Sequence, residues 1–264
     1  MILTVYFSGT GNTKYVAESF SAHMGGKCLS IEDEADFTAE FSAADTIAFC
    51  YPNYASRVPL IMRQFAERHS AGLRGKKLVI LVMQWVFSGD CARVFTDLFP
   101  KGHFDVIYAE HFAMPNNVNN LFLFPKASEN SLFKRFKEAE NKVSRVCKDI
   151  KNSIVRRRGF SIFGRFLGSI QGRLWQGKSS SFETVKGSGE HRMKNSIKIH
   201  KHCTVCELCV TVCPMKNLET KDGTIIHKNN CTVCYRCVNL CPQRAITIFF
   251  HGKPKWQYQG ILKQ

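Results

Sequence analysis

Eight cysteines in the last quarter of this 264-residue chain fall into two runs of identical spacing. Each run reads C-x2-C-x2-C-x3-C-P, first from Cys203 to Pro214 and again from Cys231 to Pro242. Three thiolates three residues apart wrap the chain around one cubane iron–sulfur cluster, and the final proline turns the chain away. Zinc usually takes two well-separated C-x2-C pairs, which these runs fit poorly. The spacing therefore predicts iron–sulfur clusters.

All eight cysteines match the pattern of bacterial two-cluster ferredoxins, which this part of the chain resembles. In that family the fourth cysteine of each run binds the cluster of the other run. The resemblance implies two [4Fe-4S] clusters. One is expected to take Cys203, Cys206, Cys209 and Cys241, and the other to take Cys231, Cys234, Cys237 and Cys213. The second run begins 28 residues after the first, which indicates an internal duplication.

A second candidate for binding chemistry lies at the start of the chain. An apolar strand is expected over residues 2–7, and a helical pattern that contains Val16, Ala17 and Phe20 follows it. The loop between them is small and rich in hydroxyls, and it consists of Ser8, Gly9, Thr10, Gly11, Asn12 and Thr13. Such a loop can cradle a phosphate, because glycines allow close approach, hydroxyls donate and the helix N-terminus faces the anion.

This loop resembles the FMN phosphate loop of flavodoxins, and on that resemblance its six residues would surround the phosphate. The alternative is an ordinary strand-to-helix turn. Further strands are expected over 27–31, 46–51, 77–83 and 104–109, and helices over 59–68, 90–99 and 131–151. The alternation indicates an α/β fold, a flavodoxin-like doubly wound parallel sheet covered on both faces. In that fold the flavin binds at the carboxyl ends of the strands.

Two loops follow expected strands at the edge where such a site needs them. The first contains Pro52, Asn53 and Tyr54, and the second contains Gln84, Trp85, Phe87 and Gly89. By resemblance to flavodoxins both loops are expected to flank the isoalloxazine ring, although the sequence of the second loop differs from the common Tyr-Gly-Asn type. Packing of aromatic side chains at the rim of the sheet is the alternative.

The segment Met114-Pro115-Asn116-Asn117 is similar to one in anaerobic proteins that fuse a flavodoxin domain to a two-cluster ferredoxin. The resemblance to this fusion family implies a flavodoxin-like FMN-binding domain over 1–152 and a basic connector over 153–195. A small α+β 2[4Fe-4S] ferredoxin domain over 196–250 and a C-terminal tail over 251–264 would follow. Residues 179–181 and 187–189 are expected to be flexible linkers. Strands over 197–200 and 245–250 are expected to pair, and Asp222-Gly223 to form a hairpin turn.

The expected connector carries an unusual charge pattern. Between Lys151 and Lys178 lie only basic charges and no acidic residue. Apolar residues recur there on one helical face, at Phe163, Phe166, Leu167, Ile170 and Leu174. Glycines four apart, at Gly164, Gly168 and Gly172, would let another element approach closely. We expect the apolar face to cover one of the two domains; the alternative is contact of 151–178 with a membrane or an acidic protein.

The composition limits the partners. A formal net charge of +16 favours acidic partners or anionic surfaces. Nucleic acid is disfavoured, because no nucleic-acid-binding module accompanies the charge. No apolar run approaches the roughly 20 residues that span a bilayer, and no secretory signal is evident. Eight thiolate ligands then predict a cytoplasmic protein of a reducing, oxygen-poor cell.

These observations favour an electron-transfer protein that relays electrons between bound FMN and two [4Fe-4S] clusters, interconverting one- and two-electron steps. Its expected partners are redox proteins, with acidic ones favoured by the charge. One alternative is an FMN-dependent oxidoreductase that reduces a small oxidant such as a quinone, with His111 or Tyr54 as proton donor. Another is a redox-responsive binder of an acidic partner or membrane. The sequence identifies no catalytic residue, so an electron carrier is preferred to an enzyme.

Overall fold

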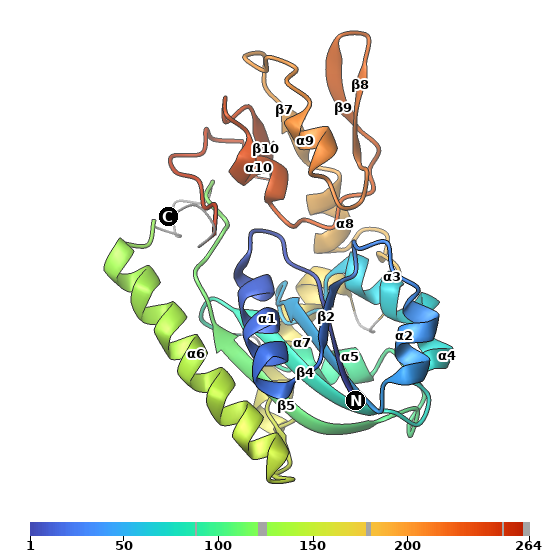
Figure 1. The fold of residues 1–264 in the computed structure, drawn as a ribbon. Coiled ribbons are helices and arrows are strands. Elements are labelled where there is room, and N and C mark those ends of the chain that lie inside the picture. Colours follow the sequence, from blue (N-terminus) through green and yellow to red (C-terminus); the bar gives the residue numbers. More distant parts are fainter. Residues whose placement is uncertain (88, 121–125, 178–180, 250, 261–264) are drawn as a thin grey trace.

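The structure, a computed structural model, describes residues 1–87, 89–120, 126–177, 181–249 and 251–260. A large part built around a sheet carries a smaller part that contains both cysteine runs (Figure 1). The smaller part lies above the edge at which the strands of the sheet end (Figure 1). The two parts therefore meet where the loops expected to bind a flavin leave the sheet.

The sheet of the large part has six strands in the order β2-β1-β3-β4-β5-β6, and neighbouring strands are parallel. The strands are β1 (Ile2–Tyr6), β2 (Lys27–Ser30), β3 (Thr46–Pro52), β4 (Lys77–Gln84), β5 (Asp105–Ala113) and β6 (Arg156–Arg157). This order confirms the predicted flavodoxin-like doubly wound sheet. From β1 the chain adds β2 on one side of the sheet and then β3 to β6 on the other, so the switch point in strand order lies between β1 and β3.

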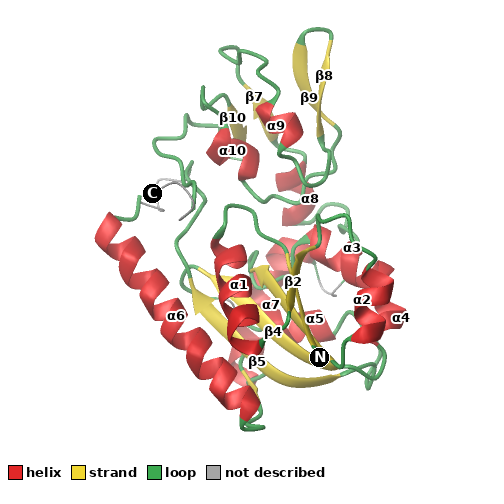
Figure 2. Cartoon of the chain, in the orientation of Figure 1, coloured by secondary structure: helices red, strands yellow, loops and turns green. Residues whose placement is uncertain are grey.

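Helices cover both faces of the sheet (Figure 2). They are α1 (Asn12–Met24), α2 (Phe37–Ala43), α3 (Leu60–Arg68), α4 (Ser70–Leu73), α5 (Cys91–Thr96), α6 (Glu129–Lys151) and α7 (Ile162–Gln176). Strand β4 shows how the two faces are filled. Its Leu78, Ile80 and Val82 join the core under α2 to α5, and Val79 and Leu81 join the core under α1 and α6. A strand buried on both sides needs such a continuous apolar run. No helix in the described ranges is long and apolar enough to cross a membrane.

The segment expected to be a basic connector adds to the large part. Strand β6 pairs with Tyr108 and Ala109 of β5, and α7 follows it. The glycine face of α7 is buried, as the spacing of its glycines predicts. A Cβ on Gly168 would lie 2.0 Å from Asp90 Oδ1, and one on Gly172 would lie 1.9 Å from Arg57 Cζ. Only glycine permits this approach.

The prediction that the apolar face of α7 covers one of the domains is wrong. Phe163, Phe166, Ile170 and Leu174 are all at least half exposed, and Leu167 is partly exposed. A helix has two faces that can pack, and here the glycine face lets the backbone come closer than an apolar face would. Lys178 and two predicted linker residues, Ser179 and Ser180, lie outside the described residues.

The smaller part is built from short elements. They are α8 (Gly189–Lys194), β7 (Ile197–Ile199), α9 (Leu208–Thr211), β8 (Leu218–Lys221), β9 (Thr224–His227), α10 (Arg236–Leu240) and β10 (Ile246–Ile248). Strands β7 and β10 pair antiparallel, as predicted, while Phe250 lies outside the described residues. Asp222 and Gly223, with φ of 48° and 70°, form the predicted turn between β8 and β9.

The predicted linker at 187–189 is instead the start of a helix. Ser188 is buried, and its side chain accepts a hydrogen bond from the backbone N–H of His191 as the N-cap of α8. Serine and glycine are common both in flexible linkers and at helix starts, so composition alone does not separate the two.

A buried ion pair joins the large part of the structure to the smaller part. Arg63 on α3 is fully buried and donates to both carboxylate oxygens of Glu190 on α8, at 3.0 and 2.8 Å. The same guanidinium donates to the carbonyl oxygen of Val58 at 2.7 Å. Glu190 is 2% exposed, so neither charge has water as a substitute partner.

We predict that Glu190→Gln destabilises the protein by about 3 kcal/mol, because it leaves the Arg63 charge buried without a counter-charge. Thermal unfolding followed by circular dichroism measures the change. Glu183→Gln is the control, since the exposed Glu183 side chain accepts a surface hydrogen bond from Gln64 and its backbone carbonyl is unchanged by the substitution. Equal melting temperatures for the two variants would contradict the prediction.

Candidate functional site

The loop between β1 and α1 leaves a helix N-terminus without a side-chain cap. Gly11 occupies the N-cap position with φ of 98°, in the left-handed region, and in the part of the chain that the structure describes no side chain forms the N-cap hydrogen bond of α1. The Gly11 N–H donates to Ser8 Oγ at 3.1 Å, which folds the loop back on itself. First-turn N–H groups are therefore available to an anion, as a phosphate cradle requires.

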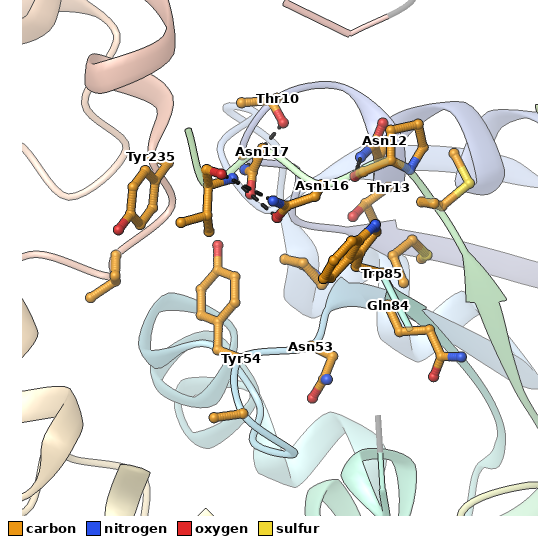
Figure 3. A pocket seen from close by; sticks show the side chains of 18 of the residues that line it. Thr10, Asn12, Thr13, Asn53, Tyr54, Gln84, Trp85, Asn116, Asn117 and Tyr235 are labelled. Atoms are coloured by element: carbon orange, nitrogen blue, oxygen red, sulfur yellow. Dashed lines mark hydrogen bonds between the residues drawn. The ribbon is translucent and has the colours of Figure 1, made fainter. Parts of the chain in front are cut away.

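A cavity of about 560 Å³ opens beside this loop (Figure 3). Eleven of the thirteen residues expected to contact a flavin line it: Ser8, Gly9, Thr10, Asn12, Thr13, Pro52, Asn53, Tyr54, Gln84, Trp85 and Phe87. Of the other two, Gly11 lines a second cavity that also borders this loop. Gly89 instead packs against Gly168 of α7. Three loops far apart in sequence thus meet around one space at the carboxyl ends of β1, β3 and β4.

Two polar atoms on the wall of this cavity are buried. The side-chain oxygens of Asn53 and Tyr54 have no hydrogen-bond partner among the described residues. Burial raises the pKa of Tyr54 well above its usual value, so the phenol stays protonated and can donate. The rings of Tyr54 and Trp85 border the same space (Figure 3). Buried polar atoms are nearly always satisfied in proteins, so these two suit a bound ligand.

His111 is not placed to act in this cavity. It lies on β5, is 3% exposed and is absent from the cavity lining. Burial, and then the nearby charges of Arg158 and Lys142, lower its pKa to about 3. Of the two proton donors considered from the sequence, only Tyr54 lines the cavity.

The second cysteine run forms part of the same cavity wall. Val233 and Tyr235, on either side of Cys234, line the cavity. Cys234 itself is buried in the core of the large part. A Cβ on Gly9 would lie 2.6 Å from the carbonyl oxygen of Cys234, so the backbones of the two segments touch.

The cysteines assigned to the other cluster are three from the first run and Cys241 from the second. Cys203, Cys206, Cys209 and Cys241 line a small void of their own, and Cys206 is exposed. None of these four lines the cavity beside the phosphate loop. Among the described residues no group of three or more His, Cys, Asp or Glu side chains is placed to hold a single metal ion. A cubane makes a different demand, since each of its irons takes its own thiolate.

Both runs present backbone N–H groups to cysteine sulfurs. Asn217 donates to Cys213 Sγ at 3.2 Å, Val233 to Cys231 Sγ at 3.1 Å and Ala245 to Cys241 Sγ at 3.3 Å. Such hydrogen bonds stabilise a negative cluster and tune its potential. The donor set therefore fits iron–sulfur clusters.

The two runs also repeat each other in backbone conformation. Left-handed residues recur at matching positions, as the pairs Val205 and Val233, Glu207 and Tyr235, and Lys216 and Arg244. A β-branched residue such as valine rarely adopts positive φ, and the strain is of the order of 1–3 kcal/mol. This repetition gives the internal duplication a structural counterpart.

Arg236 clamps the cysteine run onto the phosphate loop, and sequence reasoning did not identify it. Its guanidinium donates to the carbonyl oxygens of Ser8 at 2.7 Å and Gly9 at 3.1 Å. It also pairs with both carboxylate oxygens of Glu32 at 2.7 and 2.8 Å. Its position between Cys234 and Cys237 could have drawn attention to Arg236. The neighbouring residues in the sequence do not show, however, which loop its side chain contacts.

Two asparagines complete the contact. Asn117 Nδ2 donates to Thr10 Oγ1 and to the carbonyl oxygen of Cys234, both at 3.2 Å. Asn239 Nδ2 donates to the carbonyl oxygen of Asn117 at 2.8 Å. The Met-Pro-Asn-Asn segment thus bonds to both the phosphate loop and the cysteine run.

The C-terminal tail crosses the same place. The Tyr258 hydroxyl donates to Asn12 Oδ1, and the Tyr258 N–H donates to Asn239 Oδ1 at 2.7 Å. Gly260 lies over Thr10, so closely that a Cβ would be 2.5 Å from the Thr10 carbonyl oxygen. No local sequence pattern predicts this contact between the tail and the loop.

We predict that Gly9→Ala destabilises the protein by about 1 to 3 kcal/mol, because the new methyl group forces two backbones apart. The measurement is thermal unfolding of the anaerobically purified protein. Gly252→Ala is the matched control, since a Cβ there meets nothing within 4 Å. If the two alanine variants were equally stable, the close contact would be refuted.

Comparison with known proteins agrees with this division. Residues 3–109 match the family model described as a flavodoxin domain, and residues 193–246 match the one described as a 4Fe-4S dicluster domain. A search of curated proteins finds no match.

Several flavodoxin structures are similar to this chain. One is a flavodoxin from the domain Archaea, 18% identical, which covers 57% of this chain and 98% of its own with a TM-score of 0.40. A WrbA-like flavodoxin from Agrobacterium tumefaciens is 20% identical, with coverages of 58% and 98% and a TM-score of 0.40. The two-electron reduced flavodoxin of Megasphaera elsdenii is 21% identical, with coverages of 54% and 99% and a TM-score of 0.37.

The two matched domains support a redox function in electron transfer and imply a flavin and iron–sulfur chemistry. The chain joins an N-terminal flavodoxin domain to a C-terminal 4Fe-4S dicluster domain, and is thus a flavodoxin–ferredoxin fusion.

Proposed function

We propose that this protein relays electrons between FMN in the cavity and two [4Fe-4S] clusters, interconverting one- and two-electron steps. The observation that carries the proposal is the shared wall, in which Val233 and Tyr235 of the second cysteine run line the cavity beside the phosphate loop. A flavin exchanges one or two electrons and each cubane exchanges one, so such centres in contact can interconvert the two kinds of step.

The residues that would hold FMN are those around the cavity. Ser8 to Thr13 and the uncapped start of α1 would take the phosphate. The isoalloxazine ring would lie against the loops that carry Tyr54 and Trp85. The buried oxygens of Asn53 and Tyr54 supply an acceptor and a donor for the polar edge of the ring.

The clusters would divide the cysteines by distance from the flavin. Cys231, Cys234, Cys237 and Cys213 would hold the nearer cluster, because this set includes the residue that touches the phosphate loop. Cys203, Cys206, Cys209 and Cys241 would hold the farther one, whose Cys206 is exposed. The exposed end suits contact with a redox partner protein, so we place the exchange with outside partners there.

The chain would hold these centres in fixed positions. Arg236 bonds the nearer cysteine run to the phosphate loop, and Asn117 and Asn239 bond both to the Met-Pro-Asn-Asn segment. Because these groups come from different parts of the fold, relative movement would break several partly buried hydrogen bonds at once. A rigid arrangement would keep the distance between the flavin and the clusters short and constant. We propose that the relay operates in the cytoplasm, because its eight cysteine thiolates need a reducing environment.

We predict that Cys206→Ala loses the farther cluster but keeps the flavin and its transfer to the nearer cluster. Cys213→Ala should lose the nearer cluster and interrupt transfer from the flavin to the farther one. Light-driven reduction of the flavin, followed by rapid freezing and spin-resonance spectroscopy of the clusters, measures both. Iron and flavin analysis checks what each variant retains.

The reverse pattern, with transfer lost in Cys206→Ala and kept in Cys213→Ala, would refute the proposed order. Loss of flavin together with iron in Cys206→Ala would contradict independent binding by the two domains.

A flavin-dependent reductase is the second candidate, and the observation that favours it is the protonated Tyr54 hydroxyl on the cavity wall. A proton donor beside a flavin is needed to reduce a quinone but not to pass single electrons. Under this candidate Tyr54→Phe lowers steady-state quinone reduction by at least about a hundredfold while flavin binding persists. Under the relay, Tyr54→Phe removes one hydrogen bond to the flavin but no proton transfer, so the rate of cluster reduction changes by less than about tenfold.

A further inference from the structure

Helix α7 holds a strip of large apolar side chains in solvent. Ile162, Phe163, Phe166, Ile170 and Leu174 are between 50% and 86% exposed. Their spacing places them on one face of the helix, which over fifteen residues is about 22 Å long. Single exposed apolar residues are ordinary, but a continuous strip of this size usually marks a binding surface.

Contacts on the opposite face of α7 keep this apolar strip facing the solvent. On the opposite face Gly168 and Gly172 lie against Asp90 and Arg57, too close for any side chain to replace them. At one edge Gln171 Oε1 accepts a hydrogen bond from Ser56 Oγ at 2.7 Å. Ser161 caps the helix by accepting from the Gly164 N–H. The helix therefore cannot turn its apolar face inward without losing these contacts.

The same helix carries positive charges that have no internal partner. Arg165 and Arg173 are exposed, and their side chains form no ion pair within the part of the chain that the structure describes. The arginines just before the helix differ, since Arg156, Arg157 and Arg158 pair with Asp149, Asp105 and Glu110. No acidic residue occurs from 151 to 178, so the charged side chains of this segment are all positive and favour anions.

We propose that α7 binds the surface of a membrane that contains anionic lipids. The apolar strip would enter the boundary between headgroups and acyl chains, and Arg165 and Arg173 would meet lipid phosphates. Apolar side chains on one face with arginines beside them are what interfacial helices require. The proposal is independent of the relay, because it uses no cofactor.

Two other occupants fit the strip less well. In a symmetric dimer through α7 the same patch meets itself, so the unpaired arginines of both copies would be brought together. A protein partner would normally find hydrogen-bonding groups among the apolar ones. Here Ser169 at the edge of the strip donates its hydroxyl to the carbonyl oxygen of Phe166 in its own helix. An anionic lipid surface needs only apolar contact and positive charge.

The test is co-sedimentation of the full chain, purified with its cofactors without oxygen, with vesicles of two compositions. One is phosphatidylcholine alone, and the other is phosphatidylcholine mixed with phosphatidylglycerol. We expect binding to the anionic vesicles and at least about tenfold weaker binding to the neutral ones. Binding to the anionic vesicles should weaken as salt is raised.

Two double variants separate the contributions. Phe163→Gln with Phe166→Gln should weaken binding to anionic vesicles by at least about tenfold, because two apolar contacts are lost. Arg165→Gln with Arg173→Gln should weaken it by a similar factor, on the order of tenfold. The matched controls on α6 are Phe133→Gln, at a phenylalanine 72% exposed, and Lys137→Gln, at an exposed lysine. Both controls should bind as the unaltered protein does.

Absence of binding to anionic vesicles by the unaltered protein would overturn the proposal. Equal weakening by the α6 controls and the α7 variants would overturn it as well. A dimer in analytical ultracentrifugation that Phe163→Gln with Phe166→Gln dissociates, without vesicle binding, would assign the strip to a second copy instead. If the phenylalanine variant fails to fold, the arginine variant still tests the proposal, because the exposed side chains of Arg165 and Arg173 form no ion pair with any residue that the structure describes.

Discussion

The backbone of the second cysteine run touches the backbone of the phosphate loop. Gly9 leaves no room for a side chain at this contact, where the Cys234 carbonyl oxygen lies 2.6 Å from the place a Cβ would take. Two segments can be this close only if their buried polar groups are satisfied by each other. Arg236, Asn117 and Asn239 meet that need, and the tail through Tyr258 adds to it. The cavity, the cysteine run and the loop consequently form one unit.

The contact also explains why the two cysteine runs are not equivalent. Both share the same spacing and the same left-handed positions, as a duplicated unit should. Only the second is buried against the large part, with Cys234 in its core, while Cys206 of the first is exposed. The second run therefore forms the end of the duplicated part that is packed against the sheet domain, and the first run includes the end that is exposed to solvent. In the proposed relay this asymmetry would set the direction of electron transfer, which the repeated spacing of the two runs does not.

Much of the fold could be predicted from local pattern. The strand at 77–83 contains a continuous apolar run from Leu78 to Met83, which predicts burial on both faces, and Asp222-Gly223 predicts the turn between β8 and β9. The loops around the cavity could be found because they follow such strands. Arg236 could not be assigned, since its partners Ser8 and Gly9 are more than two hundred positions away. The predicted orientation of α7 is wrong for a different reason: amphipathic spacing identifies two faces of the helix, but the closer packing of its glycines determines which face is buried.

The central claim is that the cluster of the second run lies next to the flavin and that of the first run lies beyond it. A crystal structure of the anaerobically purified protein, with iron located by its anomalous scattering, measures this arrangement directly. The account predicts a cubane bound by Cys231, Cys234, Cys237 and Cys213 between the flavin and the second cubane. A structure in which the cubane of Cys203, Cys206, Cys209 and Cys241 is the nearer one, or in which the cavity beside Tyr54 holds no flavin, would contradict it.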